Sequence, residues 1–586
     1  ALSHAAIFRV TPAADELVHI VINPNSDEKQ GGIEVDTINR IVYGYNPVHR
    51  IYQGWGDSAG FSGHLVLKYN DELVDYGVKD GIAWLTFRGK TDVPMEFATA
   101  SSFTNKANAL NNLIVETDSL QMGFYDMMQR CQDEWLKRLH TIDVVDSDTA
   151  KVNQFYGAMY RASFLPREMS DCNGDYPEFS TGITKHIDSS LLSLHSSLKK
   201  YGDFSMWDIY RAQLPLYNIV APTLSGRMMQ SLVDMYQEGG WLPIFPCWNS
   251  YTAAMIGDHC SVALADAYAK GVRNFDADKA YEAMLKNAFE TPKSFAEYKN
   301  GMGRRALESY LKYAYIPLED SVKEAFHTCE QTSRTLEYAF DDFVVAQMAK
   351  MLGHDDDYNK LMARSHNWKN VINPKTGWAD GRYANGKWLG CKDLVNRQSF
   401  ITEGSICHYS WYVPHDVDAL VERMGGKAEF ERRLDMMFAL NDSSSAARLL
   451  YWHGNEPCHQ IPFLYSYIGK PEKTKRVVDN ILKTEYNDTP GGLSGNDDAG
   501  QMSAWYMFAA MGFYPVCPST PYYIIGAPSL DRVTFNLENK KQFEIIRQKS
   551  INNSNFVRLI LNGKQLDNCQ LSHGDIINGG KLIVKE

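Results

Sequence analysis

The spacing of apolar residues changes twice along the chain. The first part, up to about residue 135, contains short runs rich in β-branched and aromatic side chains, separated by Gly, Asn and Asp. This pattern is typical of strands in an antiparallel sandwich. It predicts strands at Ala5–Val10, His19–Asn23, His64–Lys68 and Ile82–Phe87.

From about residue 118 to about residue 512, apolar residues recur at i, i+3, i+4 and i+7. This is the spacing of helices that bury one face. It predicts helices at Val152–Phe164, Ser225–Glu238, Gly257–Lys270, Ala277–Phe289, Thr335–Met351, Tyr358–Trp368, Asp416–Met424, Ala428–Leu440, Glu472–Thr484 and Ala499–Met511. The apolar stripe of 335–351 is too broad for an isolated surface helix. So long a succession of helices fits an α/α toroid better than a four-helix bundle.

The end of the chain returns to strand-like runs, at Tyr522–Ile525, Arg532–Leu537, Val557–Leu561 and Lys581–Val584. We therefore expect an α+β multidomain fold. Its parts would be an antiparallel β-sandwich at 1–135, a helical toroid at 136–515, and strands at 516–586 packed on the toroid. No low-complexity linker separates these parts.

Composition narrows the choice of function. The formal net charge is −12 and the chain has no Lys/Arg block, which argues against a nucleic-acid partner. No run approaches the ~20 apolar residues of a membrane span. The ten cysteines are scattered and none forms a CxxC pair, which disfavours structural zinc and thioredoxin-type chemistry. An acidic enzyme that acts on a neutral sugar with a divalent cation fits this balance better.

The candidate chemistry lies in Gly-, Asn- and Pro-interrupted segments between helices, where a toroid would gather its loops over one mouth. The segment His453-Gly-Asn-Glu-Pro-Cys-His459 offers two imidazoles, an amide and a carboxylate. His453, Asn455 and Glu456 could bind a hard cation or sugar hydroxyls. A well-bonded helix cap is the alternative interpretation.

Two adjacent carboxylates, Asp497 and Asp498, follow a glycine-rich run and open the helix predicted at 499–511. One aspartate explains the N-cap of that helix, and the second needs another task. Oxygen ligands of this kind suit calcium, and an ionised carboxylate at a helix N-terminus could also remove a proton from water. The spacing leaves these alternatives open, although the run is not an EF-hand loop.

Glu403 precedes a glycine and the aromatic residues Tyr409, Trp411 and Tyr412. An apolar neighbourhood keeps a carboxyl protonated, as a general acid requires, whereas a helix cap is the simpler alternative.

Trp207, Asp208 and Arg211 make a plausible sugar-binding set, an aromatic floor with polar groups for hydroxyls. An internal Asp–Arg pair is the alternative. Trp248 is a weaker candidate of the same kind.

Taken together, these motifs resemble glycoside hydrolase family 92. The matching segments are Trp-Asp-x-Tyr-Arg at 207–211, Val-Pro-His-Asp at 413–416, His-Gly-Asn-Glu-Pro at 453–457 and Gly-Asn-Asp-Asp-Ala-Gly-Gln-Met-Ser-Ala-Trp-Tyr at 495–506. The resemblance implies a β-sandwich joined to an (α/α)6 barrel. It also implies an exo-acting, inverting, calcium-dependent α-mannosidase that removes α-1,2-linked mannose from glycans, at a secreted, periplasmic or cell-surface location.

Carried over by motif, the resemblance assigns roles to individual residues. Glu403 would be the general acid, and Asp498 or Asp497 the base, with Asp498 preferred. The expected metal ligands are Asn455, Glu456 and Asp498. The expected sugar contacts are Trp207, Asp208, Arg211, His453, Asn455 and Trp248.

The sequence departs from the family pattern in two places. His408 replaces an amide after the acid, and a further stretch is normally found before the sandwich. Two other functions stay open, a non-catalytic, calcium-dependent mannose-binding protein and another (α/α)6 glycosidase or phosphorylase. A phosphorylase would need a basic phosphate-binding loop, and we identify none in the sequence.

Overall fold

The computed structural model describes residues 1–24, 30–51, 57–187, 199–322, 326–439, 450–549 and 557–586. Contacts divide the chain into two compact units. Unit 1 comprises Ala1–Arg138, Arg167–Asp203 and Cys247–Ser250, and unit 2 comprises Leu139–Pro166, Phe204–Pro246 and Tyr251–Glu586. The expected domain limits at residues 135 and 515 stay a prediction.

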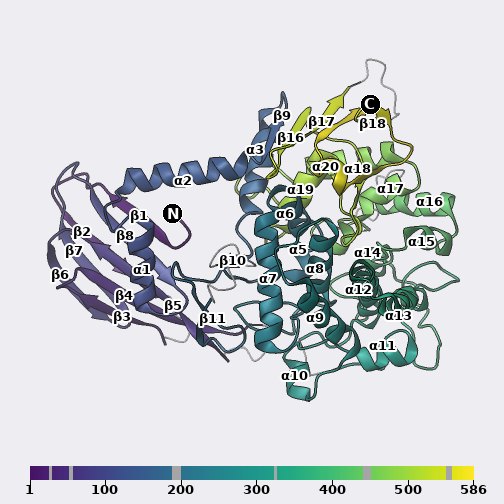
Figure 1. Cartoon of the computed structure of the whole chain (residues 1–586), viewed down its shortest axis with the longest axis horizontal. Coiled ribbons are helices and arrows are strands. Elements are labelled where there is room, and N and C mark those ends of the chain that lie inside the picture. Colours follow the sequence, from purple (N-terminus) through teal and green to yellow (C-terminus); the bar gives the residue numbers. More distant parts are fainter. Residues whose placement is uncertain (25–29, 52–56, 188–198, 323–325, 440–449, 550–556) are drawn as a thin grey trace. The chain divides into compact units, whose positions relative to one another are not determined.

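The strands of unit 1 form antiparallel sheets, shown in purple in Figure 1. One sheet has the order β1-β8-β5-β4-β3 and another the order β2-β7-β6. Their bounds are β1 Ala5–Val10, β2 Leu17–Ile22, β3 Gly32–Asp36, β4 Ile41–His49, β5 Ser58–Tyr69, β6 Leu73–Lys79, β7 Ile82–Arg88 and β8 Met95–Ser102. The predicted strands correspond to β1, β2, β5 and β7, so the N-terminal antiparallel architecture is confirmed.

Alternation along these strands builds the core of unit 1. Val42 and Leu67 from the five-stranded sheet and Leu85 and Phe87 from the three-stranded sheet belong to one buried cluster. Successive side chains of a strand point to opposite faces, so one face of each sheet supplies this cluster. The sheets are therefore stabilised by packing on each other, as in a sandwich.

The prediction of strands alone before residue 118 is wrong for helix α1, Lys106–Glu116. The side chain of Asn105 caps it by accepting a hydrogen bond from the backbone N–H of Asn108. The apolar period is hidden because the inner face of α1 carries buried polar residues, Asn108 and Asn112, which donate hydrogen bonds to aspartates. A second helix, α2, follows at Phe124–Leu139.

Unit 2 is mainly helical. Its longer helices are α3 Thr149–Arg161, α6 Gln213–Val220, α7 Pro222–Gly239, α8 His259–Ala269, α9 Ala277–Phe289, α12 Gln331–Leu352, α13 Asp355–Ser365, α16 Lys427–Met437, α18 Pro471–Thr484 and α19 Gln501–Met511. Shorter ones are α5 Met206–Ile209, α10 Phe295–Lys299, α11 Leu307–Tyr313, α14 Ile406–Tyr409, α15 Val417–Arg423, α17 Leu464–Tyr467 and α20 His573–Ile577. Short 3-10 turns lie at η2 His366–Asn370, η4 Glu456–Cys458 and η5 Ile461–Phe463.

Each helix predicted from the periodicity is present, as α3, α7, α8, α9, α12, α13, α15, α16, α18 or α19. Leu440, the predicted last residue of α16, lies outside the described residues. Helix α12 packs against α8, α9 and α13 and is buried along most of its length, which explains its broad apolar stripe. Among the described residues, no helix is both long and apolar enough to cross a membrane.

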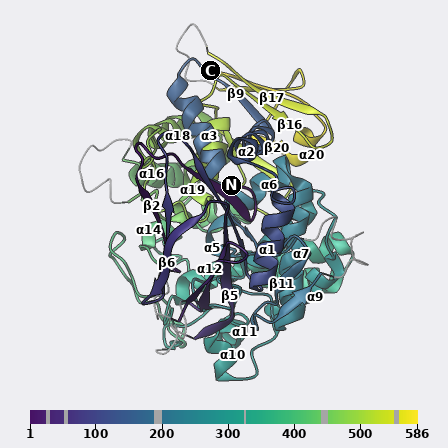
Figure 2. The same ribbon diagram turned by 90° about the vertical axis from the view of Figure 1, so that its left-hand side faces the viewer.

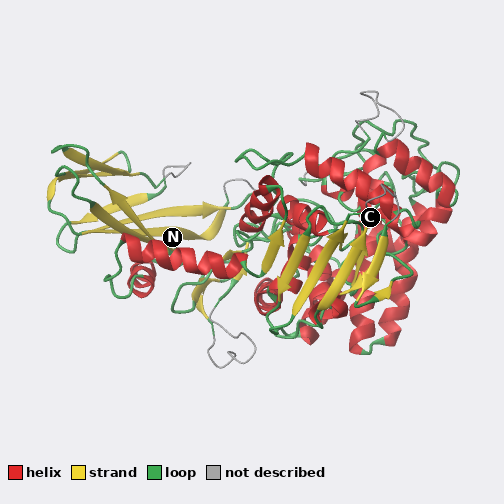
Figure 3. Ribbon diagram, turned by 90° about the horizontal axis from the view of Figure 1, so that it is seen from above, coloured by secondary structure: helices red, strands yellow, loops and turns green. Residues whose placement is uncertain are grey.

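The end of the chain forms strands that belong to unit 2. They are β14 Phe513–Tyr514, β15 Tyr522–Ile525, β16 Arg532–Asn536, β17 Gln542–Gln548, β18 Arg558–Leu561, β19 Lys564–Gln565, β20 Gln570–Ser572 and β21 Gly580–Lys585. Strand β9, Ile142–Val145, joins their largest sheet by pairing with β16, and it stands out in blue beside the yellow strands of Figure 2. Figure 3 shows this sheet as a row of strands beside the red helices of unit 2.

Short strand pairs also occur where only helices were expected. In unit 1, β10 Arg167–Glu168 pairs with β13 Tyr201–Gly202, and β11 Asp175–Pro177 pairs with β12 Thr184–His186. These strands have two or three residues each, too few for a period to be read from the sequence. The fold class expected from the sequence is nevertheless confirmed, with antiparallel sheets first, a helical domain next and strands at the end.

Candidate active site

A group of three carboxylates lies in unit 2, carried by residues far apart in the sequence. Asp208 is in α5, Glu456 begins the turn η4, and Asp498 precedes α19. Carboxylate oxygens of these residues all lie within 4.8 Å of one another. We call Asp208, Glu456 and Asp498 the acidic cluster. The structure thus brings together residues from three of the segments singled out in the sequence.

Asp208 shows how strongly these carboxylates influence one another. Its side chain is 6% exposed, and the hydroxyl of Ser205 donates a 2.6 Å hydrogen bond to it. Burial, the largest cause, together with the negative charges of Asp498 and Glu403, raises the pKa of Asp208 to about 8. The effect of Glu403 places the predicted acid within electrostatic reach of the acidic cluster.

Glu456 is the most deeply buried member of the acidic cluster. It is 4% exposed, and its Oε1 has no hydrogen-bond partner among the described residues. Burial raises the pKa of Glu456 well above its usual range, and the charge of Asp208 and interactions with Asp498 add to the shift. A buried carboxylate oxygen without a donor is costly unless a cation or a proton meets it. These three side chains therefore fit a hard divalent cation, which prefers oxygen ligands.

Asp497 and Asp498 are neighbours in sequence but face different surroundings. Asp497 accepts a 2.9 Å hydrogen bond from the backbone N–H of Ser503 and lies 3.9 Å from the guanidinium of Arg161. It therefore pairs with a backbone N–H of the first turn of α19, whose N-cap residue is Gly500. Asp498 has φ of 46°, in the left-handed region, and its carboxylate joins the acidic cluster.

The predicted acid Glu403 is an exposed residue at a tight turn. Its φ is 48°, again left-handed, and Gly404 follows. A Cβ at residue 404 would lie 2.9 Å from side-chain nitrogens of both Asn455 and His408. Asn455 also donates a 3.3 Å hydrogen bond to the carbonyl of Glu403. Glycine is needed here because the turn carrying Glu403 packs directly on the segment carrying Glu456.

Glu337, a residue that the sequence analysis missed, links two parts of the site. This fully buried residue of α12 accepts hydrogen bonds from the indole N–H of Trp207 at 3.1 Å and the hydroxyl of Tyr409 at 2.9 Å. Trp207 precedes Asp208, and Tyr409 ends the short helix α14 after Glu403. No motif distinguishes Glu337 in the sequence, because it lies in the middle of a helix among apolar residues.

Gln501 forms a second buried link. Its side-chain oxygen accepts a hydrogen bond from the backbone N–H of Ala212 at 3.0 Å, and its amide nitrogen pairs with His459 at 3.1 Å. These contacts connect the start of α19 with the segments that carry Asp208 and Glu456.

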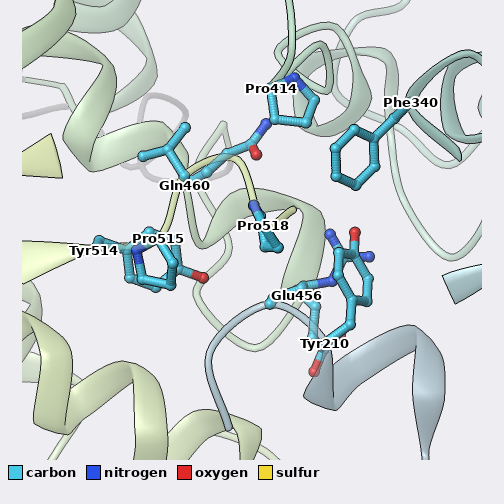
Figure 4. A pocket seen from close by; sticks show the side chains of 10 residues that line it. Tyr210, Phe340, Pro414, Glu456, Gln460, Tyr514, Pro515 and Pro518 are labelled. Atoms are coloured by element: carbon cyan, nitrogen blue, oxygen red, sulfur yellow. The ribbon is translucent and has the colours of Figure 1, made fainter. Parts of the chain in front are cut away.

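Arg211 packs against three aromatic rings of the site. Its guanidinium carbon is 4.9 Å from the ring centroid of Trp207, 4.7 Å from that of Tyr210 and 5.3 Å from that of Tyr412. Arg211 and Glu456 also line a small cavity, whose lining is shown in Figure 4. A volume of about 10 Å³ holds about one water molecule and no sugar ring.

The other predicted sugar contacts have partners within the protein, and their contact with a sugar stays a prediction. Trp207 is only 1% exposed. Both ring nitrogens of His453 pair with tyrosine hydroxyls, those of Tyr451 at 2.9 Å and Tyr486 at 2.6 Å. Trp248 belongs to unit 1, where the guanidinium carbon of Arg167 lies 5.1 Å from its ring centroid.

Comparison with known proteins shows which family the chain matches. The family model described as "Glycosyl hydrolase family 92 catalytic domain" matches residues 108–585. A curated relative from Arthroderma benhamiae, called an uncharacterized secreted glycosidase, is 27% identical over 534 residues. The match covers 85% of this chain and 62% of that relative.

Solved structures from Bacteroides thetaiotaomicron are similar over almost the whole chain. A family GH92 α-mannosidase matches with a TM-score of 0.85 and 28% identity, covering 99% of this chain and 77% of its own. A family GH92 inverting mannosidase matches with a TM-score of 0.87 and 27% identity, covering 99% of this chain and 80% of its own.

The buried polar network behind the site predicts a pH-dependent stability. His259 lies 3.1 Å from Glu337 and 3.1 Å from Asp341, and it stacks on Tyr210. Burial alone would lower the pKa of His259, but the two carboxylates raise it to about 9. Because the folded-state pKa exceeds the usual 6.5, the stabilisation is complete below pH 6.5 and is lost as pH rises through 9. We expect the free energy of unfolding to fall by up to about 3 kcal/mol over this window.

Urea unfolding between pH 6.5 and 9.5 compares the parent chain with the His259→Gln variant. The difference between their slopes is the contribution of His259, because Asp208, with a pKa of about 8, titrates in both chains. Burial raises the pKa values of Tyr210 and Tyr409 well above 10, so these hydroxyls stay protonated in the window. Arg304, which faces Asp341, keeps its charge, since nearby carboxylates raise its pKa further. If His259→Gln unfolds with the same pH slope as the parent chain, His259 is not the group responsible.

Proposed function

Because the chain belongs to glycosyl hydrolase family 92, we propose that it is an inverting exo-α-mannosidase that uses calcium to remove terminal α-1,2-linked mannose from glycans. The observation that carries this proposal is the acidic cluster, with a buried oxygen of Glu456 that lacks a donor and Glu403 within electrostatic reach. The printed names of the solved relatives, α-mannosidase and inverting mannosidase, support the reaction and the substrate class.

We propose a division of labour that combines the roles implied by the family with the surroundings of the two aspartates. Glu403 donates its proton to the glycosidic oxygen as the bond to the anomeric carbon breaks. Asp498 accepts a proton from the water that attacks the opposite face of the sugar, which inverts the anomeric configuration. Asp498 is preferred to Asp497 because the Asp497 carboxylate already accepts a hydrogen bond from the backbone N–H of Ser503 in the first turn of α19.

The calcium would be held by Asp208, Glu456 and Asp498, with Asn455 beside them. When bound, calcium supplies positive charge that compensates these carboxylates and a fixed point for sugar hydroxyls. The chain's own residues set up this site in advance. Ser205 orients Asp208, and Gly404 lets Asn455 approach the turn of Glu403.

The substrate and location are proposed from the chemistry and the relatives. A cation that contacts adjacent hydroxyls of the ring would distinguish mannose, whose O2 is axial, from glucose. The relative from Arthroderma benhamiae is called a secreted glycosidase, and we propose that this chain also acts outside the cell. The chain spans 62% of the length of that curated relative. The assays below therefore use the 586-residue chain itself.

The function as a whole is tested with α-1,2-mannobiose, assayed with calcium and after treatment with EGTA. We expect free mannose to appear first as the β-anomer in NMR spectra. We also expect the rate to fall at least about 10-fold on chelation and to recover when calcium is added back, because the site loses the charge that balances its carboxylates.

Each alternative gives a different result in this assay. Sugar binding without hydrolysis would indicate a mannose-binding protein, and a requirement for inorganic phosphate would indicate a phosphorylase. Initial release of the α-anomer would contradict inversion. An unchanged rate after exhaustive chelation would remove calcium from the scheme.

The role of Glu403 is tested by varying the leaving group. In Glu403→Gln, hydrolysis of mannobiose should fall by roughly 10²–10⁴-fold, since its alkoxide leaving group needs a proton. Hydrolysis of a dinitrophenyl α-mannoside, whose leaving group needs none, should fall far less. Comparison of kcat/KM for both substrates gives the answer, and equal losses would argue against a general acid at this position.

The adjacent aspartates provide a matched pair for the base. Asp498→Asn should lower kcat by roughly 10²-fold or more for both substrates, because water activation does not depend on the leaving group. Asp497→Ala should mainly destabilise α19, by about 1 kcal/mol, because its side chain can no longer accept the hydrogen bond from the backbone N–H of Ser503. Measurements of kcat and of thermal unfolding for both variants separate the two roles. The reverse pattern would assign the base to Asp497.

A further inference from the structure

A second cluster of potential ligands lies in unit 1. His4 immediately precedes β1, Glu116 ends α1, and Cys172 follows β10. Nδ1 of His4 is 2.8 Å from Oε1 of Glu116. Sγ of Cys172 is 3.7 Å from the same nitrogen and 3.9 Å from the same oxygen. An imidazole nitrogen, a carboxylate oxygen and a sulfur thus surround one point.

The other polar atoms of these residues are anchored to the surrounding structure. Nε2 of His4 pairs with the carbonyl of Ser170 at 2.8 Å. Oε2 of Glu116 accepts hydrogen bonds from the backbone N–H groups of His4 at 3.0 Å and Ala5 at 2.8 Å. Because a carbonyl orients the far ring nitrogen of His4 and backbone donors hold one carboxylate oxygen, the remaining Nδ1 and Oε1 are directed together. This is the outer-shell arrangement that usually supports metal ligands.

Cys172 is held in place as well. Its backbone N–H donates a 2.9 Å hydrogen bond to the side chain of Asn112. In tetrahedral zinc sites, ligand atoms at the usual metal distances lie about 3.4–3.6 Å from one another. The three separations in this cluster are 2.8, 3.7 and 3.9 Å, on both sides of this value. A shift of less than about 1 Å would therefore bring the three atoms into position.

We propose that His4, Glu116 and Cys172 form a zinc-binding site in unit 1. Nitrogen, oxygen and thiolate sulfur are the ligand types that zinc takes, and a sulfur ligand selects against calcium and magnesium. With three protein ligands, the fourth position of a tetrahedron is open to water. The site would join β1 to the end of α1 and to the segment after β10.

The lack of closely spaced cysteines in the sequence disfavours only those zinc sites that are built from one local motif. Here the ligands come from residues 4, 116 and 172, which only the fold brings together. The alternative is an ion pair between His4 and Glu116 beside a neutral thiol, without a metal.

Cobalt(II) serves as the probe, because a thiolate bound to cobalt gives a charge-transfer band in the near ultraviolet. The whole chain is stripped of metal and titrated with cobalt chloride. We expect a band that saturates at about one cobalt per chain and disappears when zinc is added. Cobalt held by the acidic cluster of unit 2 would give no such band, since its side chains carry no sulfur.

Two cysteine variants complete the experiment. Cys172→Ser should abolish the band and weaken binding at this site by roughly 100-fold or more. Cys131→Ser, which changes another free and partly exposed cysteine of unit 1, should keep the band. Absence of the band in the parent chain overturns the proposal, as does an equal band in Cys172→Ser. If Cys172→Ser does not fold, the His4→Gln titration and the parent chain's stoichiometry decide the question in the same way.

Discussion

The site depends on one constraint. Its carboxylates are buried close to one another, and their negative charges repel. Asp208 and Glu456 are almost fully buried, and their pKa values rise because of that burial and of the charges of neighbouring carboxylates, Asp498 for Asp208 and Asp208 for Glu456. Such a group is stable only when a cation or protons compensate the charge. The same constraint accounts for the donor-free oxygen of Glu456 and for the proposed calcium, and it makes occupancy depend on competition between cation and protons.

The fold withstands this repulsion because buried hydrogen bonds connect the segments that carry the carboxylates. Glu337 on α12 receives hydrogen bonds from Trp207 and Tyr409, and Gln501 connects the start of α19 to two other segments. These bonds lie in the buried interior, where leaving one unpaired would be costly. The loops over the helices therefore behave as one preorganised site, although each is short and irregular by itself.

The sequence predicted the long elements and the motif-bearing residues, and it missed those whose role depends on tertiary contacts. Periodicity identified α12 and α19, but it failed for α1, whose inner face holds buried asparagines bonded to aspartates. Asp208, Glu456 and Asp498 were found because each lies in a polar segment that interrupts an apolar pattern. Glu337 sits within such an apolar pattern. Only the structure shows which side chains meet it.

The two carboxylates proposed to move protons share a strained backbone conformation. Glu403 and Asp498 both have left-handed φ values, 48° and 46°, in turns just before α14 and α19. That conformation costs about 1–2 kcal/mol for a residue with a side chain, and a fold retains it only where surrounding contacts outweigh the strain. Gly404 permits close packing at the turn of Glu403. The hydrogen bond between Ser503 and Asp497 stabilises the turn of Asp498. These two turns are therefore held by tertiary contacts and not by the conformational preference of the residues themselves.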